Sequence, residues 1–124
     1  MAAPNLVNVA TITAKSDSLL LTGTSATKLL ENTASSGKVI KVNSLVVANV
    51  DGTNAATITV GIYPQDDIAG TPVLIASTIS VPADATLVVI DKNMGYYLEE
   101  DTSIGVTASA GNDLTCHITY EELS

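Results

Sequence analysis

The sequence contains no Phe, no Trp and no Arg. Without the two largest side chains, a core must be built from Val, Ile, Leu and Ala, which suit pleated sheets. Only five Lys oppose 13 Asp and Glu, for a net charge of −8. Nucleic-acid binding is therefore not expected, because it needs a basic surface that neutralises phosphates, and binding to an anionic membrane surface is disfavoured for the same reason.

The single cysteine, Cys116, excludes an internal disulfide and fits a reducing compartment. The N-terminal stretch MAAPNLVNVATITAK has neither a basic start nor a continuous apolar segment, so we expect no signal peptide. No apolar run approaches the length that spans a bilayer. Together these features predict a soluble protein that is made in the cytoplasm and kept inside the cell until it is released.

Apolar and polar residues alternate with a period of two along most of the chain, which predicts strands rather than helices. A length of 124 residues is that of one domain. We therefore expect residues 1–124 to form a single-domain, all-β, antiparallel β-sandwich of about eight or nine strands, with jelly-roll or Ig-like topology. Residues 1–9 are either an extended N-terminal arm or an ordinary first strand. The strand-like segments are 6–13, 18–22, 25–32, 39–50, 56–63, 73–81, 86–91, 96–98, 103–109 and 114–121, of which 25–32 could instead form one helical turn.

Two segments, 45–50 and 86–90, are apolar on both faces. This pattern is expected of a central strand or of a strand that another subunit covers. Other strands should carry one face of threonines, at Thr57 and Thr59 and again at Thr115 and Thr119. Such faces are polar enough for solubility yet flat enough to pack against a neighbour.

Three acidic features are candidates for metal binding: residues 51–54 (Asp-Gly-Thr-Asn), the pair 66–67 (Asp-Asp) and the cluster 99–101 (Glu-Glu-Asp). A calcium loop needs several oxygens at set spacing, and the first feature offers only Asp51 and Asn54. We interpret it as a turn, in which Gly52 gives backbone freedom and Asp51 caps its own backbone. The other two are expected to be solvated loop charge, with calcium between loops as the alternative. We predict no metal site and no cofactor-binding residue.

The only histidine, His117, falls on the threonine face of the last strand, opposite Cys116. No G-x-S-x-G motif is present, and no second His or Arg is available to bind a substrate. Cys116 alternates onto the apolar face, where we expect a buried and inert thiol. The sequence thus predicts no catalytic residue, and we expect that the protein is not an enzyme.

The only aromatic residues are four tyrosines, at positions 63, 96, 97 and 120. Tyr96 and Tyr97 are adjacent, so they should point to opposite faces of their strand. Two or three exposed tyrosines are a fair indication of an interface and a weaker one of a sugar-binding platform.

Most of the chain, roughly from Lys38 to Leu123, resembles small virion structural proteins of tailed bacteriophages, notably those of marine and cyanobacterial phages. The resemblance is carried by VNSLVVANVDGTNAATITVGIY and by ISVPADATLVVIDKNMGYYLEEDTSIGVTASAGNDLTCHITYEEL. Its recurring features are Asn-x-Asp-Gly between two strands, a strand like VPADATLVVLDK, an entry like YYLEEGDSL and a closing SYEE. At Asp101 and Thr102 this chain lacks the usual glycine, which leaves the type of that turn open.

The resemblance implies a non-enzymatic β-sandwich or jelly-roll protein on the particle surface, in the neck or in the tail. We expect a capsid decoration or cement protein located in the virion, with the major capsid protein or another virion protein as its partner. We also expect it to form a homo-oligomer, with a trimer as the first guess. The alternatives are a neck or tail protein and a carbohydrate- or receptor-binding β-module. The expected interface residues are Leu6, Val7, Val9, Tyr63, Tyr96 and Tyr97.

Overall fold

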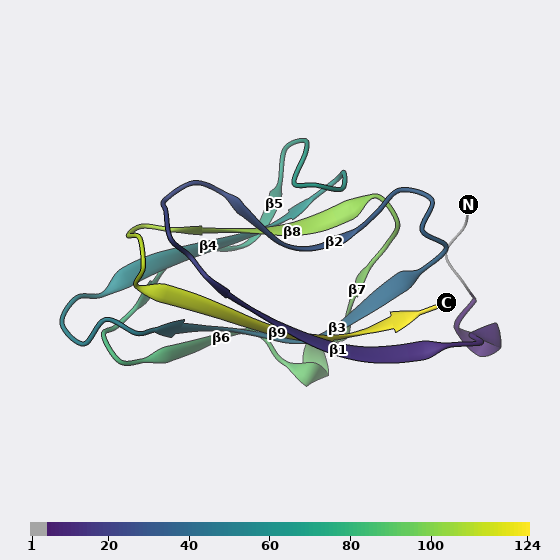
Figure 1. The fold of residues 1–124 in the computed structure, drawn as a ribbon, viewed down its shortest axis with the longest axis horizontal. Coiled ribbons are helices and arrows are strands. Elements are labelled where there is room, and N and C mark those ends of the chain that lie inside the picture. Colours follow the sequence, from purple (N-terminus) through teal and green to yellow (C-terminus); the bar gives the residue numbers. More distant parts are fainter. Residues whose placement is uncertain (1–4) are drawn as a thin grey trace.

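The computed structural model describes residues 5–124, which form nine strands and two short 3₁₀ helices (Figure 1). Residues 1–4 of the expected N-terminal arm lie outside the described residues. The strands are β1 (Ile12–Leu20), β2 (Thr27–Asn32), β3 (Val39–Asn49), β4 (Ala56–Tyr63), β5 (Val73–Val81), β6 (Thr86–Ile90), β7 (Tyr96–Leu98), β8 (Thr102–Ala108) and β9 (Leu114–Leu123), and the helices are η1 (Leu6–Asn8) and η2 (Lys92–Met94).

The strands form two stacked antiparallel sheets, which confirms the expected single-domain β-sandwich (Figure 1). Sheet A has the order β1-β9-β3-β6, and β7 also pairs with β3. Sheet B has the order β2-β8-β4-β5. β6 and β7 pair with different parts of β3 while β9 pairs along its length, so β6, η2 and β7 follow one another along a single sheet edge.

Most connections between consecutive strands pass from one sheet to the other. β4 and β5 form a hairpin within sheet B, whereas β3 and β4 lie in different sheets. The Asp-Gly segment at 51–52 is therefore a corner between sheets and not a hairpin turn. The prediction that this turn requires a glycine with positive φ is wrong, because the φ of Gly52 is not positive.

Aliphatic residues from both sheets fill the space between them, as the absence of Phe and Trp requires. The central strands β3 and β9 contribute Leu45, Val47 and Ile118, and β4 and β8 contribute Ile58 and Ile104, all fully buried. These residues alternate along each strand, so one face of each sheet is buried and the other carries polar residues. The doubly apolar segment 45–50 belongs to a central strand, in agreement with one of the two expected explanations.

Two buried asparagines join the sheets at the ends of their strands. Asn49 at the end of β3 donates to the carbonyl of Val81 in sheet B and to that of Asn54, each at 2.9 Å. Asn32 at the end of β2 donates to the carbonyl of Leu98 in sheet A at 3.0 Å. Because each amide satisfies carbonyls that burial removes from water, both residues fix the position of one sheet over the other.

The N-terminal segment differs from the expected strands at 6–13 and 18–22. Residues Leu6–Asn8 form η1, which begins where the side chain of Asn5 accepts the N–H of Val7 at 2.9 Å. One uninterrupted strand, β1, then covers residues 12–20, including the polar stretch that separated the two predictions. The reason is its partner β9, which supplies a continuous ladder that local propensity does not reveal. The segment 25–32, which was open between strand and helix, contains the strand β2.

Candidate functional site

A groove of about 350 Å³, lined largely by apolar residues, lies at one lateral margin of the sandwich. Tyr96 of β7 contributes to it from sheet A, while Ile62 and Tyr63 of β4 and Val73 and Ile75 of β5 contribute from sheet B. The groove thus opens between the two sheets. Pro64, Thr71 and Thr102 complete its lining.

An exposed apolar surface borders this groove along the edge strand β5. Val73 is 73% exposed, and Leu74, Ile75 and Ile79 are also exposed. Val88 of β6, a strand of sheet A that contacts β5, is exposed as well. We call these five residues the β5 rim. Exposed aliphatic side chains gathered along an edge strand are typical of protein–protein contacts in soluble proteins.

The β5 rim was not among the expected interface residues. Alternation along 73–81 predicts a strand but does not say that this strand lies at a sheet edge. The ladder between β4 and β5 is irregular at two places. Its register shifts between Ile58 and Val60 and again between Val60 and Gly61. Thr78 lies near the first shift with φ 47°, and its N–H donates to the side chain of Thr59 at 3.0 Å.

Of the six expected interface residues, Tyr63 and Tyr96 come together in the groove. Tyr97 points away from it and is 42% exposed, as the alternation of neighbouring side chains predicts. Leu6 and Val7 are exposed in η1, and Val9 is half-buried just after it. This segment adjoins β1 and the C-terminal residue, because Ala10 and Thr11 both donate to the carbonyl of Ser124. It therefore lies at the opposite lateral margin from the groove.

The ring of Tyr63 is positioned by a glycine on the adjacent strand β8. A Cβ at Gly105 would lie 2.5 Å from a carbon of the Tyr63 ring and 3.1 Å from Ile68. The ring therefore covers the backbone of Gly105 and is held against sheet B. On the other side of the groove, burial and the charge of Glu99 both raise the pKa of Tyr96.

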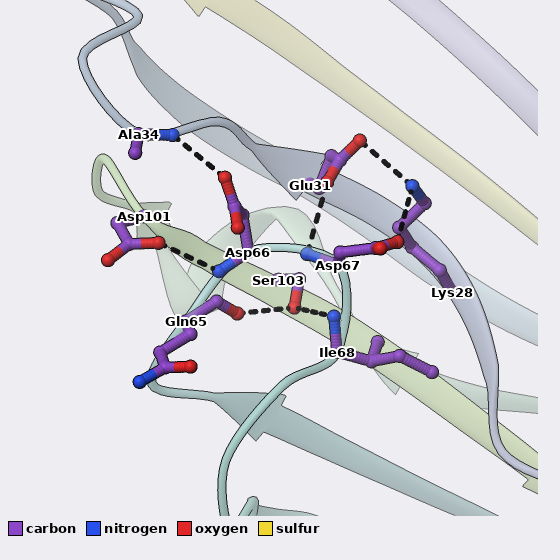
Figure 2. A network of polar contacts seen from close by, with 9 residues as sticks. All are labelled: Lys28, Glu31, Ala34, Gln65, Asp66, Asp67, Ile68, Asp101 and Ser103. Carbon is purple, nitrogen blue, oxygen red and sulfur yellow. Dashed lines mark hydrogen bonds and ion pairs between the residues drawn. The ribbon is translucent and has the colours of Figure 1, made fainter.

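The two acidic clusters meet at one end of the sandwich, where their carboxylates bind backbone amides (Figure 2). The loop between β4 and β5 contains both aspartates of the first cluster. The side chain of Asp66 accepts the N–H of Ala34 at 2.9 Å, and Asp67 pairs with Lys28 at 3.0 Å. Glu31 accepts the N–H of Asp67 and also pairs with Lys28 at 2.9 Å. These bonds attach the loop to β2.

A third attachment joins the same loop to the turn before β8. Asp101 accepts the N–H of Asp66, and the hydroxyl of Ser103 accepts the N–H of Ile68 while donating to the carbonyl of Gln65 (Figure 2). Asp101 has φ 59°, so an aspartate takes the left-handed conformation that favours glycine. Among residues 5–124, no group of three or more His, Cys, Asp or Glu side chains is placed to hold a metal ion. Asp66, Asp67 and Asp101 thus order the loop, while Glu100 accepts the N–H of Gly37 in the connection between β2 and β3.

Asp51 has a similar local role. One carboxylate oxygen accepts the N–H of Thr53 at 2.9 Å, and the other accepts the side-chain amide of Asn54 at 3.3 Å. The N–H of Asp51 donates in turn to the buried Asn49. This carboxylate caps its own backbone, as the sequence predicts, and it belongs to the corner that Asn49 organises.

His117 lies on the exposed outer face of sheet A, as alternation predicts. Its Nδ1 is 3.0 Å from the hydroxyl of Ser18 on β1, a contact that the sequence did not reveal. Its Nε2 is 3.3 Å from the hydroxyl of Thr115. The pair lies on an open sheet face, outside the groove. Cys116, on the opposite face, is fully buried, and burial raises the pKa of its thiol to about 12.

A second, shallower hollow of about 320 Å³ is polar. It lies where β3 bulges between Val42 and Ser44, and Asn43, Lys15 and Thr119 are among the residues that line it. Asn43 donates to Glu121 at 3.1 Å, while its carbonyl oxygen is buried without a partner among the described residues. The residues that line this hollow come from β1, β3 and β9, which are neighbouring strands of sheet A.

No protein-family model matches the sequence, and no characterised protein matches it at a significant level. Among the described residues, no helix is long and apolar enough to cross a membrane. The structure is similar to a chain of the capsid of Ralstonia phage GP4, with 14% identity and a TM-score of 0.43, over 98% of this chain and 90% of that chain. It is also similar to a chain of infectious bursal disease virus, Gx strain, with 9% identity and a TM-score of 0.33, over 90% of this chain and 37% of that chain. Likeness at this level is not evidence of a shared function.

Proposed function

We propose that this chain is a non-enzymatic structural protein of a tailed-phage virion, and that it decorates the assembled capsid. The observation that carries the proposal is the β5 rim, an aliphatic surface beside an aromatic groove on a chain with a net charge of −8. A protein with so much acidic charge stays dispersed while free and needs an apolar surface in order to associate. The sequence resemblance to small phage virion proteins supplies the context.

The topology supports the same proposal. An Ig-like sandwich pairs its first two strands in one sheet. Here β1 and β2 lie in different sheets, and the orders β1-β9-β3-β6 and β2-β8-β4-β5 are those of eight strands arranged as a jelly roll, with β7 as an addition. Jelly rolls are frequent in viral capsid domains and also in lectins. The topology therefore supports a capsid-type protein and a lectin equally.

The mechanism of a decoration protein is mass action. A protein that binds only the assembled shell stabilises that shell by the free energy of binding each copy. We propose that the β5 rim forms the contact within a homo-oligomer, with a trimer as the first copy number to test. The strand β5 contains no charged residue, so little entropy of long side chains is lost when the rim is buried.

The test combines light scattering after size exclusion with co-sedimentation on empty capsids of the phage that encodes the chain. We expect an oligomer that sediments with capsids, and we expect Val73→Asp to reduce both the oligomer and the capsid-bound fraction at least tenfold. The control is Val50→Asp, at an exposed valine in the loop after β3, which should change neither. A monomer that stays in the supernatant with capsids contradicts the proposal.

Two outcomes would redirect the assignment within the virion or outside it. Binding to purified necks or tails but not to capsids would place the protein there, since the resemblance covers those positions as well. Binding to a glycan array that is lost in Tyr97→Ala would favour the carbohydrate-binding alternative. Tyr63 and Tyr96 face the groove, so Tyr97 is the exposed aromatic ring on which that alternative depends.

A further inference from the structure

The outer edge of β1 differs from the other sheet edges that residues 5–124 form, because it is regular over its whole length. β1 pairs with β9 without a register shift from Ile12 to Leu20. The ladders of β2, β5 and β6 all contain register shifts, and β7 has three residues. Bulges and short strands are the features by which sheets prevent their edges from pairing with another strand. β1 has neither of them, and it contains no Pro.

The free backbone groups of β1 can be identified from its hydrogen bonds. Thr11 and Ser124 exchange both backbone bonds, at 2.9 and 3.0 Å. In an antiparallel ladder such pairs alternate, so odd-numbered residues of β1 direct their N–H and C=O groups toward β9. Even-numbered residues direct their N–H and C=O groups outward. Outside the strand ladders, residues 12–20 make no backbone hydrogen bond with any of residues 5–124. The outward groups belong to Ile12, Ala14, Ser16, Ser18 and Leu20.

We propose that this edge pairs with the β1 edge of a second copy of the chain, antiparallel, about a twofold axis at Ser16. In this register Ser16 faces Ser16 of the second copy, and outward-directed residues meet outward-directed residues throughout. Lys15 then faces Asp17 of the second copy, and the same pair occurs again across the axis. Ile12, which is 61% exposed, faces Leu20, which is 44% exposed. The strand is therefore complementary to itself in charge and in apolar contact.

Charge also excludes the neighbouring registers. A slip of two residues places Lys15 opposite Lys15 or Asp17 opposite Asp17, and like charges in direct opposition destabilise a strand pair. A slip of one residue places outward groups opposite inward groups, so the backbone bonds cannot form. Among the registers within two residues of it, only the register centred on Ser16 satisfies both conditions.

The surroundings of β1 accommodate such a partner. Ala14, Ser16 and Ser18 are small, so the two strands can approach to the spacing of a sheet. Lys15 lies 3.2 Å from Glu122, but an ammonium group has three donors and can bind a second carboxylate. The β5 rim lies at the opposite margin of the sandwich and stays free. The contact makes sheet A continuous across two copies, and it does not depend on the proposed virion role.

A disulfide trap tests the register. In the proposed pair the two Ser16 Cα atoms lie about 5.5 Å apart, within the range that a disulfide bridges. We expect mild oxidation of Ser16→Cys to give a covalent dimer in most of the protein. The control is Ser18→Cys, whose equivalent positions lie about 14 Å apart and should stay unlinked. Cys116 is buried and does not interfere. An unlinked Ser16→Cys protein, or equal linking of both variants, would overturn the proposal.

A charge exchange tests the pairing without a covalent bond. We expect Lys15→Asp and Asp17→Lys each to halve the mass of the solution assembly in sedimentation equilibrium, and the double exchange to restore it. Lys92→Asp in η2 makes the same change in net charge at a site away from β1, and it should leave the mass of the assembly unchanged. Circular dichroism establishes that each variant is folded. If the single variants keep the wild-type mass, or if the folded double exchange fails to restore it, the twofold contact is wrong.

Discussion

The backbone N–H of Asp66 donates to a carboxylate oxygen of Asp101 at 3.0 Å, which joins the β4–β5 loop to the turn before β8. Asp101 has φ 59° and therefore holds a backbone conformation that favours glycine. One residue thus supplies both the turn and the acceptor. The loop in question carries part of the lining of the apolar groove, so its order bears on the shape of that groove.

A series of substitutions at Asp101 separates these two contributions. Asn keeps an acceptor oxygen and tolerates the left-handed region, so Asp101→Asn should change the free energy of unfolding by less than about 0.5 kcal/mol. Asp101→Gly loses only the acceptor and should cost about 1 kcal/mol. Asp101→Ala loses the acceptor and strains the backbone, and should cost about 2 kcal/mol or more. Urea unfolding measures all three, and equal values for Ala and Gly would show that the backbone strain is unimportant.

Asn49→Asp should destabilise the protein by several kcal/mol at neutral pH, in a strongly pH-dependent way. The amide of Asn49 donates to the carbonyls of Val81 and Asn54, and a carboxylate in its place would face both carbonyls without a donor. Burial there raises the pKa of the new carboxyl, so the loss of stability grows as pH rises above about 4, its ordinary value. Unfolding at pH 7 and at about pH 4 measures the difference.

The matched control for this prediction is Asn54→Asp, at an exposed position of the same corner. Only the backbone carbonyl of Asn54 binds Asn49, so this carboxyl stays in water and its effect should be small. A similar loss of stability in both variants would mean that general acidic repulsion, and not the buried amide, is responsible.

Glu122 should contribute to stability at neutral pH and lose that contribution in acid. Burial opposes ionisation of this carboxyl, but hydrogen bonds from Lys15 and Lys38 outweigh burial and lower its pKa in the folded state. A lowered pKa stabilises the fold above the unfolded value of 4.5, and the contribution disappears as pH falls through the folded value. The melting temperature of Glu122→Gln should therefore be lower than that of the wild type at pH 7, and the gap should narrow as pH falls below 4.5. A gap that is constant with pH would contradict this.

Gly105→Ala should destabilise the protein by about 1–3 kcal/mol, because the added methyl group overlaps the ring of Tyr63. We expect the fluorescence of the tyrosines to change as well, since the ring must move out of the groove. Gly23→Ala is the control: a Cβ there meets nothing within 4 Å, and stability should be unchanged or slightly higher. Chemical denaturation of the two variants gives the comparison directly.

Strands with clear alternation and firm boundaries could be predicted from the sequence. β4 at 56–63 alternates throughout, and β5 at 73–81 lies between Pro72 and Pro82, so both have the expected bounds. The strand expected at 6–13 was wrong over residues 6–11, because a β-rich composition does not require a strand. A strand forms where a partner binds it, and the partner of β1 lies near the other end of the chain.

The candidate surfaces were predictable only in part, for a related reason. Alternation assigns a residue to a face of its strand but not to the centre or the margin of a sheet. Tyr63 and Tyr96 line one groove because the end of β4 and the start of β7, from different sheets, both border it. The β5 rim could not be found from the sequence, since Ile75 and Ile79 have the same pattern as core residues. Their exposure depends on the position of β5 as the last strand of sheet B.

The pairing of β1 with β9 has a consequence for synthesis on the ribosome. Within residues 5–124, β9 is the only strand that pairs with β1, and it also separates β1 from β3. β1 leaves the ribosome well before β9 is translated, so both of its edges are unpaired during that interval. Sheet A can close only when β9 inserts between two strands that already exist. Folding of this half of the sandwich is therefore completed after translation of the last strand, and nascent chains are open to premature contact with one another through β1.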